Sequence, residues 1–214
     1  MLETQDLTFS YDGTTQILQS IDMKINRGEL LLITGPTGSG KSTLAKCLSG
    51  FIPRSIEGFF SGSILIDDEN TEYLSIAEFS KMVSLVQQDP ESQICTLRVS
   101  DEVAFGPENY GFDEKLVENL VESSLSDVNS MHLFQRTTHT LSGGEKQRIA
   151  IAAMLSCQSD FIILDEPSSS LDPQGIIQLR KILSNLKTKN VGVICIEHNL
   201  GAISPIADRN LCLE

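Results

Sequence analysis

The sequence predicts an α/β fold, with a mainly parallel sheet as its core, an antiparallel β part at the N-terminus and an inserted helical subdomain. Three patterns lead to this prediction. Short, wholly apolar segments alternate with longer helical patterns, which is typical of parallel strands covered on both faces. Apolar and polar residues alternate near the N-terminus, as in half-buried antiparallel strands. From residue 91 to residue 156 strand patterns are absent, which indicates a helical insertion.

Antiparallel strands come first in the chain. Apolar residues recur between Leu7 and Ile25, and the turn-forming sequence Tyr11-Asp12-Gly13 interrupts them. A turn between two alternating segments is typical of a hairpin. Residues 62–67 predict one more short strand of this kind.

The parallel core follows from four short apolar segments, each followed by a polar or turn residue: Leu30–Thr34, Val83–Gln87, Phe161–Asp165 and Val191–Ile196. A helix is predicted between the last two. Asp172 suits the N-cap, Pro173 suits the first helical position, and apolar residues recur at helical spacing from Ile176 to Leu186.

The helical insertion contains two apolar stripes at helical spacing, Leu116–Leu125 and Ile149–Leu155. A chain of 214 residues is long enough to bury one core with a subdomain. We therefore interpret residues 1–214 as a single domain. Residues 1–88 and 157–214 form its core with the antiparallel β part, and residues 89–156 form the helical subdomain.

Composition and charge exclude several classes of protein. With 16 basic and 29 acidic residues the formal net charge is −13, which argues against nucleic acid as a partner because a polyanion needs clustered positive charge. The apolar runs fall far short of the roughly 18 to 20 residues of a membrane-spanning helix, and the N-terminus has no secretion-signal pattern. Five widely spaced cysteines, mostly within apolar segments, indicate reduced core thiols in a cytosolic protein.

A phosphate-binding loop follows the first core strand. Residues 35–42 match the pattern G-x-x-x-x-G-K-[ST] between a predicted strand and a predicted helix. Glycines let the backbone N–H groups point at phosphate oxygens, and the helix directs the positive end of its dipole at the same place. We expect Lys41 to reach the β- and γ-phosphates and the Ser42 hydroxyl to bind Mg²⁺. The expected nucleotide-binding residues here are Gly35, Pro36, Thr37, Gly38, Ser39, Gly40, Lys41, Ser42 and Thr43.

Two acidic residues end another core strand. Asp165 and Glu166 follow four apolar residues, so a buried strand delivers them to the carboxyl edge of the sheet, beside the phosphate-binding loop. We expect Asp165 to hold Mg²⁺ and Glu166 to polarise a water molecule for attack on the γ-phosphate. The core is therefore predicted to bind a nucleotide with Mg²⁺.

A second anion-binding device lies at residues 141–148, Leu-Ser-Gly-Gly-Glu-Lys-Gln-Arg. Ser142, Gly143 and Gly144 precede an apolar helix, so a hydroxyl and free N–H groups stand at a helix N-terminus. Together with the P-loop, this motif resembles the signature of the ABC-type ATPases, here with Glu145 in place of the usual glutamine. The resemblance implies the P-loop NTPase fold of ABC ATPases, with ATP and Mg²⁺ as cofactors and ATP hydrolysis as the activity.

The same resemblance extends across nearly the whole chain and implies roles for four further residues. Tyr11 is similar to the aromatic residue that stacks on adenine, and Gln88 resembles the Q-loop glutamine that senses Mg²⁺ and the γ-phosphate. Asp172, in Ser170-Leu171-Asp172, resembles the D-loop aspartate. His198, directly after a core strand, resembles the switch histidine that hydrogen-bonds the γ-phosphate.

In the ABC family two ATPase domains face each other head to tail, with each ATP between the P-loop of one and the signature of the other. The resemblance therefore implies a homodimer, or a heterodimer with a related ATPase domain. Residues 88–93 and 101–109 resemble the ATPases of energy-coupling factor (ECF) importers for vitamins, cobalt or nickel. This implies a transmembrane T component and a substrate-binding S component as partners, and a peripheral place on the cytoplasmic face of the cell membrane.

Two alternatives remain open. One is a soluble ABC ATPase that is not coupled to transport, although the coiled-coil insert, zinc modules or basic surfaces of such proteins are not found in the sequence. The other is a regulatory subunit that binds nucleotide without turnover. The presence of Glu166, Gln88 and His198 argues against it. ECF ATPases usually carry a C-terminal extension, so we also expect the chain to be part of a longer protein.

Overall fold

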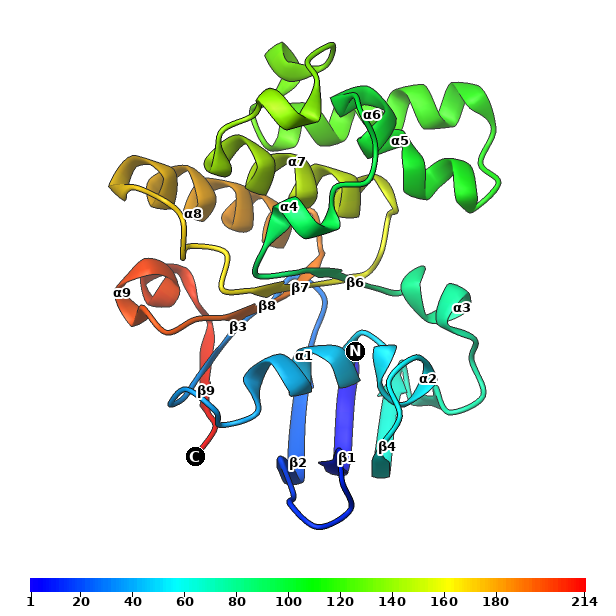
Figure 1. Cartoon of the computed structure of the whole chain (residues 1–214), viewed down its shortest axis with the longest axis vertical. Coiled ribbons are helices and arrows are strands. Elements are labelled where there is room, and N and C mark those ends of the chain that lie inside the picture. The colour runs from blue at the N-terminus through cyan, green and yellow to red at the C-terminus, as the bar shows by residue number, and fades with distance from the viewer.

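The computed structural model describes all residues 1–214, which form two sheets and the helices that cover them (Figure 1). The larger sheet has five parallel strands in the order β6-β7-β8-β3-β9. Their bounds are β3 Leu30–Thr34, β6 Val83–Val86, β7 Phe161–Asp165, β8 Gly192–Ile196 and β9 Arg209–Cys212. The predicted parallel core is thus confirmed, and β9 is a fifth strand beyond the four that the apolar segments predicted.

The smaller sheet is antiparallel, with strand order β2-β1-β4-β5. It comprises β1 Leu2–Ser10, β2 Leu18–Ile25, β4 Phe59–Ile66 and β5 Glu69–Asn70. Arg27 ties this sheet to the core, because its guanidinium donates to Asp67 at 2.7 Å and to Asp160 at 2.8 Å. Both ion pairs raise the pKa of Arg27, that with Asp67 the more.

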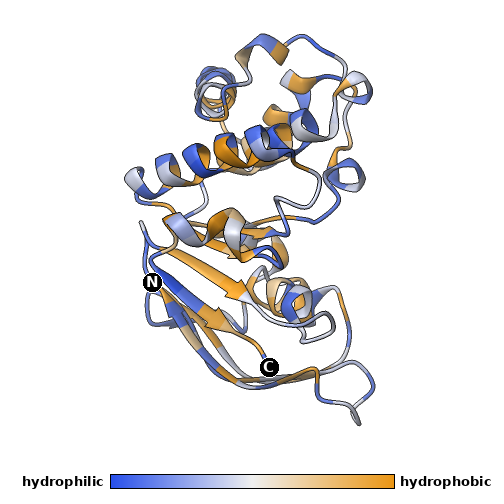
Figure 2. Cartoon of the chain, turned by 90° about the vertical axis from the view of Figure 1, so that its left-hand side faces the viewer, coloured by the Kyte–Doolittle hydropathy of each residue, from blue (hydrophilic) through white to orange (hydrophobic).

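Each face of the parallel sheet packs against different elements, because side chains alternate along a strand. In β3, Leu31 and Ile33 belong to a core shared with the antiparallel sheet and α1 (Lys41–Leu48). Leu30 and Leu32 point the other way, into a core with α8 (Pro173–Thr188) and α7 (Gly143–Ser156). Figure 2 shows apolar residues concentrated on these strands and on the inner sides of the helices.

The helical subdomain lies on the side of the sheet opposite α1, at the top of Figure 1. Its helices are α4 Pro90–Gln93, α5 Val99–Asn109, α6 Glu114–Asp127 and α7, with short 3-10 turns at Met131–Leu133 and Thr138–Thr140. An isolated bridge between Arg98 and Thr137 is the β pairing found there. The smaller helices of the core are α2 Phe51–Arg54, α3 Ile76–Ser80 and α9 Leu200–Ile203, the last followed by a 3-10 turn at Ser204–Ile206.

Two further findings bear on the expectations from sequence. None of the helices combines the length and the apolar character that crossing a bilayer requires. The expectation of buried thiols holds for Cys47, Cys157 and Cys195 but is wrong for Cys95 and Cys212, which are exposed. Cys95 lies in the loop before α5, and Cys212 lies on the edge strand β9, where one side of the sheet has no neighbouring strand.

Candidate functional site

The loop between β3 and α1 is shaped by its glycines. Gly40 caps α1 in the left-handed conformation, with φ of 89°, and a Cβ there would lie 2.8 Å from the Ile17 carbonyl oxygen. A Cβ on Gly38 would meet nothing within 4 Å. The backbone of the loop is therefore open to a ligand at Gly38 and tightly packed at its base, as a phosphate-binding loop requires.

Lys41 is folded back onto the same loop. Its ammonium donates to the carbonyl oxygens of Gly35, at 3.0 Å, and Pro36, at 2.7 Å. The side chain is only 5% exposed, and its hydrogen-bond partners are neutral carbonyls rather than a carboxylate. A buried cation without an acidic partner in contact is a strong attraction for an anion that enters the loop.

Asp165 ends β7 beside the first turn of α1. Burial raises the pKa of its carboxyl group, while the nearby Ser42 hydroxyl opposes the shift. The Asp165 Oδ1 atom is buried and has no hydrogen-bond partner, and the same holds for Ser39 Oγ in the loop. Mg²⁺ prefers oxygen ligands and is usually held by one or two carboxylates together with phosphate. The orphaned carboxylate oxygen beside a serine hydroxyl therefore fits a Mg²⁺ site.

Glu166 joins two residues from distant parts of the sequence. One carboxylate oxygen accepts from Gln88 Nε2 at 2.8 Å, and the other lies 2.9 Å from His198 Nε2. Glu166 itself has a φ of 49°, and its backbone N–H donates to the Ile196 carbonyl oxygen at 2.9 Å. The turn after β7 is thus anchored to β8, so that the carboxylate faces both partners.

Tyr11 lies beside the first turn of α1. Its ring packs edge-on against Phe9, with 4.8 Å between the ring centroids, and its hydroxyl lies 3.3 Å from Thr43 Oγ1. About 46% of Tyr11 is exposed, which leaves part of the side chain available for stacking. A groove of about 640 Å³ collects residues of five segments: Tyr11, Ile17, Thr37, Gly38, Gly40, Lys41, Ser42, Thr43, Gln88, Glu166 and His198.

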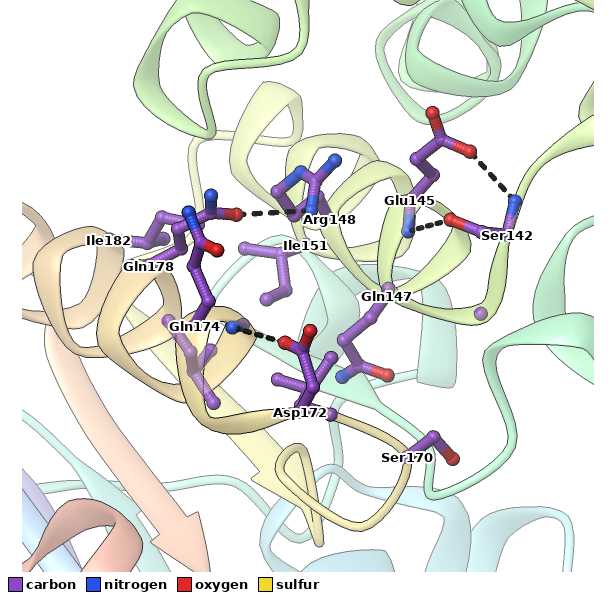
Figure 3. Close-up of a pocket in the computed structure, with 15 residues that line it drawn as sticks. Ser142, Glu145, Gln147, Arg148, Ile151, Ser170, Asp172, Gln174, Gln178 and Ile182 are labelled. Atoms are coloured by element: carbon purple, nitrogen blue, oxygen red, sulfur yellow. Dashed lines mark hydrogen bonds between the residues drawn. The ribbon is translucent and has the colours of Figure 1, made fainter.

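The second predicted anion-binding site lies apart from the groove, at the start of α7 (Figure 3). Ser142 and Glu145 form a capping box: the Ser142 N–H donates to Glu145 Oε2 at 2.7 Å, and the Glu145 N–H donates to Ser142 Oγ at 3.4 Å. The hydrogen bond from the Ser142 backbone is the main reason that the pKa of Glu145 is lowered. Glu145 thus takes part in the capping of α7.

A hollow of about 540 Å³ opens beside this helix N-terminus. Ser142, Gly143 and Gly144 line it together with Asp172, which caps α8 by accepting from the Gly175 N–H at 2.7 Å. Figure 3 shows Arg148 joined to Gln178 across the hollow, at 3.3 Å. The structure therefore places Asp172 with the signature residues rather than with the P-loop.

The expected site residues thus fall into two groups. Tyr11, Gln88, Glu166 and His198 lie around the P-loop groove with Lys41 and Ser42, and Asp165 lies just beside it. Ser142, Gly143, Gly144 and Asp172 line the signature hollow. No residue lines both spaces.

Two residues near the site had not been singled out from the sequence. Glu197, 2% exposed, accepts from the Ser168 N–H at 2.9 Å, and burial raises its pKa. A glutamate directly after an apolar strand and before His198 was the available signal. Asp12 accepts from the N–H groups of Thr14 and Thr15, both at 2.8 Å, and so orders the turn next to Tyr11.

Comparisons with known proteins agree with this geometry. The sequence profile described as "ABC transporter" matches residues 18–169. A protein of Methanosarcina mazei, provisionally named an ABC transporter ATP-binding protein, is 41% identical over 100% of this chain and 37% of its own length. One of Pyrococcus horikoshii with the same provisional name is 36% identical over 100% of this chain and 80% of its own length. The chain thus spans little more than a third of the Methanosarcina relative.

The solved structures include a similar fold. CbiO1 of Clostridium perfringens, described as part of the ABC transporter complex CbiONQ, has 31% identity and a TM-score of 0.89, over 100% of this chain and 84% of that one. Its similarity covers both the parallel core and the helical insertion. The chain therefore belongs to the ABC transporter family, as an ATP-binding domain of the ATPase type whose cofactors are ATP and Mg²⁺.

Proposed function

We propose that the chain is the ATP-hydrolysing part of an ECF-type importer, and that it pairs head to tail with a second copy or a related ATPase domain around ATP. The importer would carry a vitamin or a cobalt or nickel ion. A transmembrane T component and a substrate-binding S component would be its partners, at the cytoplasmic face of the membrane.

The separation of the two anion sites is the observation that carries the pairing. The P-loop groove and the signature hollow share no lining residue, yet each has the features of a phosphate site. A triphosphate that contacts both kinds of site is accommodated when two domains face each other. Each domain carries one half-site of each kind, so a pair of domains would form two complete sites.

Within the groove, the chain's own residues divide the work of binding. Lys41 would exchange its two loop carbonyls for phosphate oxygens, which gives the buried ammonium an anionic partner. Tyr11 would stack on the base. Ser42 and Asp165 would hold Mg²⁺, with Gln88 as a further oxygen ligand, and this ion supplies neutralisation of the charge on the phosphates.

Glu166 would act as the base for the attacking water. A carboxylate has about four lone-pair sites, so Glu166 can accept from a water while it keeps its contact to Gln88 and gives up that with His198 Nε2. As the water oxygen bonds to the γ-phosphorus and the bond to the β-phosphate oxygen breaks, the water proton passes to Glu166. His198 would donate a hydrogen bond to the γ-phosphate, whose departure removes the contact between the paired domains.

The division into subdomains gives this chemistry a mechanical use. We assign nucleotide binding to residues 1–88 and 157–214, and presentation of the signature to residues 89–156. Gln88 ends the first core segment and contacts Glu166, so the helical subdomain begins at the catalytic carboxylate. Loss of the γ-phosphate would therefore occur next to Gln88, where the core joins the helical subdomain.

The ECF assignment rests on two supports. The first is the sequence of residues 88–93 and 101–109, and the second is the likeness to CbiO1 of the CbiONQ complex. The test is purification of the tagged full-length protein from native membranes in mild detergent. We expect integral membrane proteins to copurify at a fixed ratio, and their identification would give the S component and the cargo. Recovery of the ATPase alone, from the soluble fraction, would contradict the assignment and favour the uncoupled ABC ATPase.

A further inference from the structure

Gln93, the last residue of α4, is bonded to the backbone at the end of β6. Its side-chain oxygen accepts from the Gln87 N–H at 3.0 Å, and its side-chain nitrogen donates to the Leu85 carbonyl oxygen at 2.9 Å. The N–H of one residue and the carbonyl of the residue two before it face the same side of a strand. A single side-chain amide therefore takes both positions that a neighbouring strand would occupy.

That side of β6 has no other strand beside it. β6 is the edge strand of the parallel sheet, with β7 on its other side. Edge N–H and carbonyl groups are otherwise satisfied by water, and the end of such a strand is free to shift. Gln93 thus fixes the last residues of β6 at the edge of the sheet, directly before the residue that reaches the catalytic carboxylate.

The segment between Gln87 and Gln93 is closed into a compact loop by its own contacts. The Asp89 carboxylate caps α4 by accepting from the Glu91 N–H at 3.0 Å, and Ser92 Oγ donates to the Asp89 carbonyl oxygen at 2.8 Å. Figure 1 shows α4 between β6 and α7. Gln88 lies inside this loop, and its Nε2 donates to Glu166 at 2.8 Å.

We propose that Gln93 is a positioning residue for ATP hydrolysis, which holds Gln88 in contact with Glu166 by bonding to the edge of β6. The proposal rests on the roles given above to Gln88 and Glu166. Gln93 has no hydrogen bond to the P-loop or to Glu166 and acts through Gln88. Its loss is therefore expected to lower kcat far more than it changes the KM for ATP, because Lys41 and Tyr11, which are proposed to contact the phosphates and the base, keep their positions.

The experiment compares four forms of the full chain: wild type, Gln93→Leu, Gln88→Ala and the double variant. Leucine keeps the size of glutamine and removes both hydrogen bonds to β6. We expect Gln93→Leu to lower kcat about fivefold to tenfold, as the loss of two positioning hydrogen bonds allows. In the Gln88→Ala background the same change should alter kcat less than about twofold, because the two residues act in one chain of contacts.

Two further variants separate positioning from general damage. Gln93→Glu keeps the shape and one acceptor but places a second oxygen against the Leu85 carbonyl, so kcat should again fall while the melting temperature shows that the chain is folded. Glu91→Gln is the matched control on the same helix. It breaks the ion pair with Lys146, at 2.8 Å, and leaves the β6 contacts intact, so kcat should stay within about twofold of wild type.

The outcomes distinguish this proposal from the proposed function. An equal loss of kcat from Gln93→Leu with and without Gln88 would overturn the positioning role alone, and so would a raised KM with unchanged kcat. Unchanged turnover in Gln88→Ala would overturn the role of Gln88 itself and with it the role of Gln93. A normal kcat in both Gln93→Leu and Gln93→Glu would also refute the proposal.

Discussion

The P-loop groove and the signature hollow are both built at a helix N-terminus, but they differ in how their polar groups are paired. In the groove, Lys41 has only neutral carbonyls and Asp165 has an unpaired buried oxygen. In the hollow, Ser142 and Glu145 cap each other, and Arg148 is bonded to Gln178. Apart from the buried Gln147 amide, whose nitrogen lacks a partner, the hollow is largely satisfied without a ligand.

This difference indicates which part of the site depends on the nucleotide. The groove leaves charged groups without partners, so binding of Mg²⁺ and the phosphates should stabilise it more than it stabilises the hollow. The hollow keeps its shape by internal bonds and offers the N–H groups at the start of α7 as a preformed surface. Substitutions in the groove should therefore change binding or chemistry in the same domain, whereas substitutions in the hollow should act on the site of the facing domain.

The largest effect is expected from Glu166, the proposed base in the groove. Glu166→Gln removes the carboxylate that we propose accepts the water proton and keeps the size of the side chain. We expect kcat to fall by about 100- to 10,000-fold, the range for loss of a general base, while ATP binding persists. Turnover is measured by phosphate release and binding by equilibrium titration, with Glu91→Gln as a carboxylate-to-amide control. Undiminished hydrolysis would remove Glu166 from the role of base and weaken the contrast between the two regions.

A smaller effect is expected at the outer end of the groove. Asp12 orders the turn after Tyr11, and its hydrogen bonds from Thr15 and Thr14 hold the pKa of its carboxyl group below the ordinary value. Asp12→Ala should free the ring of Tyr11 and raise the KM for ATP by about fivefold. Inhibition by tripolyphosphate, which has no base, should be unchanged.

Asp22→Ala serves as the matched control for that prediction. Asp22 accepts from the Asp6 N–H on the antiparallel sheet, at 2.6 Å, and is absent from the residues that line the groove. The KM for ATP should then stay at the wild-type value. An equal loss of affinity for ATP and tripolyphosphate in Asp12→Ala would show that the turn shapes the P-loop rather than the base site.

The smallest effect concerns stability near the groove. Burial raises the pKa of Glu197 above 4.5, so between pH 4.5 and the folded pKa the folded chain binds a proton more strongly than the unfolded chain. Stability from this group is therefore lost as pH rises from about 4.5 through the folded pKa. Glu197→Gln should raise the melting temperature by a few degrees at pH 8 and by less at pH 5. A lower melting temperature at pH 8 would show instead that the carboxylate is needed to hold Ser168.

The fold class could be predicted from the sequence because it depends on local patterns of apolar, turn-forming and capping residues. Apolar segments followed by turns predicted four of the five parallel strands, and the cap at Asp172 with Pro173 predicted the start of α8. The fifth strand, β9, was not among the apolar segments, since two of its four residues, Arg209 and Asn210, are polar and the strand is largely exposed at the sheet edge. Exposure of Cys95 and Cys212 likewise depends on tertiary placement that a cysteine count does not contain.

The site was predictable where backbone motifs define it and less so where side chains meet. The P-loop and the capping serine of α7 follow from spacing alone. That Glu166 bonds both Gln88 and His198 depends on the order of β6, β7 and β8 in the sheet, which the strand patterns do not fix. The edge contact of Gln93 requires knowing that β6 lacks a second neighbour.

The most direct test of the account is the mass of the Glu166→Gln chain with and without ATP, measured by sedimentation. Because this variant should bind without hydrolysing, ATP is expected to double the sedimenting mass, ADP to leave it single, and the added change Ser142→Arg to abolish the doubling. A chain that binds ATP with full affinity but stays monomeric at every concentration would contradict the account. The ATP-binding site would then be complete without the signature motif of a second domain.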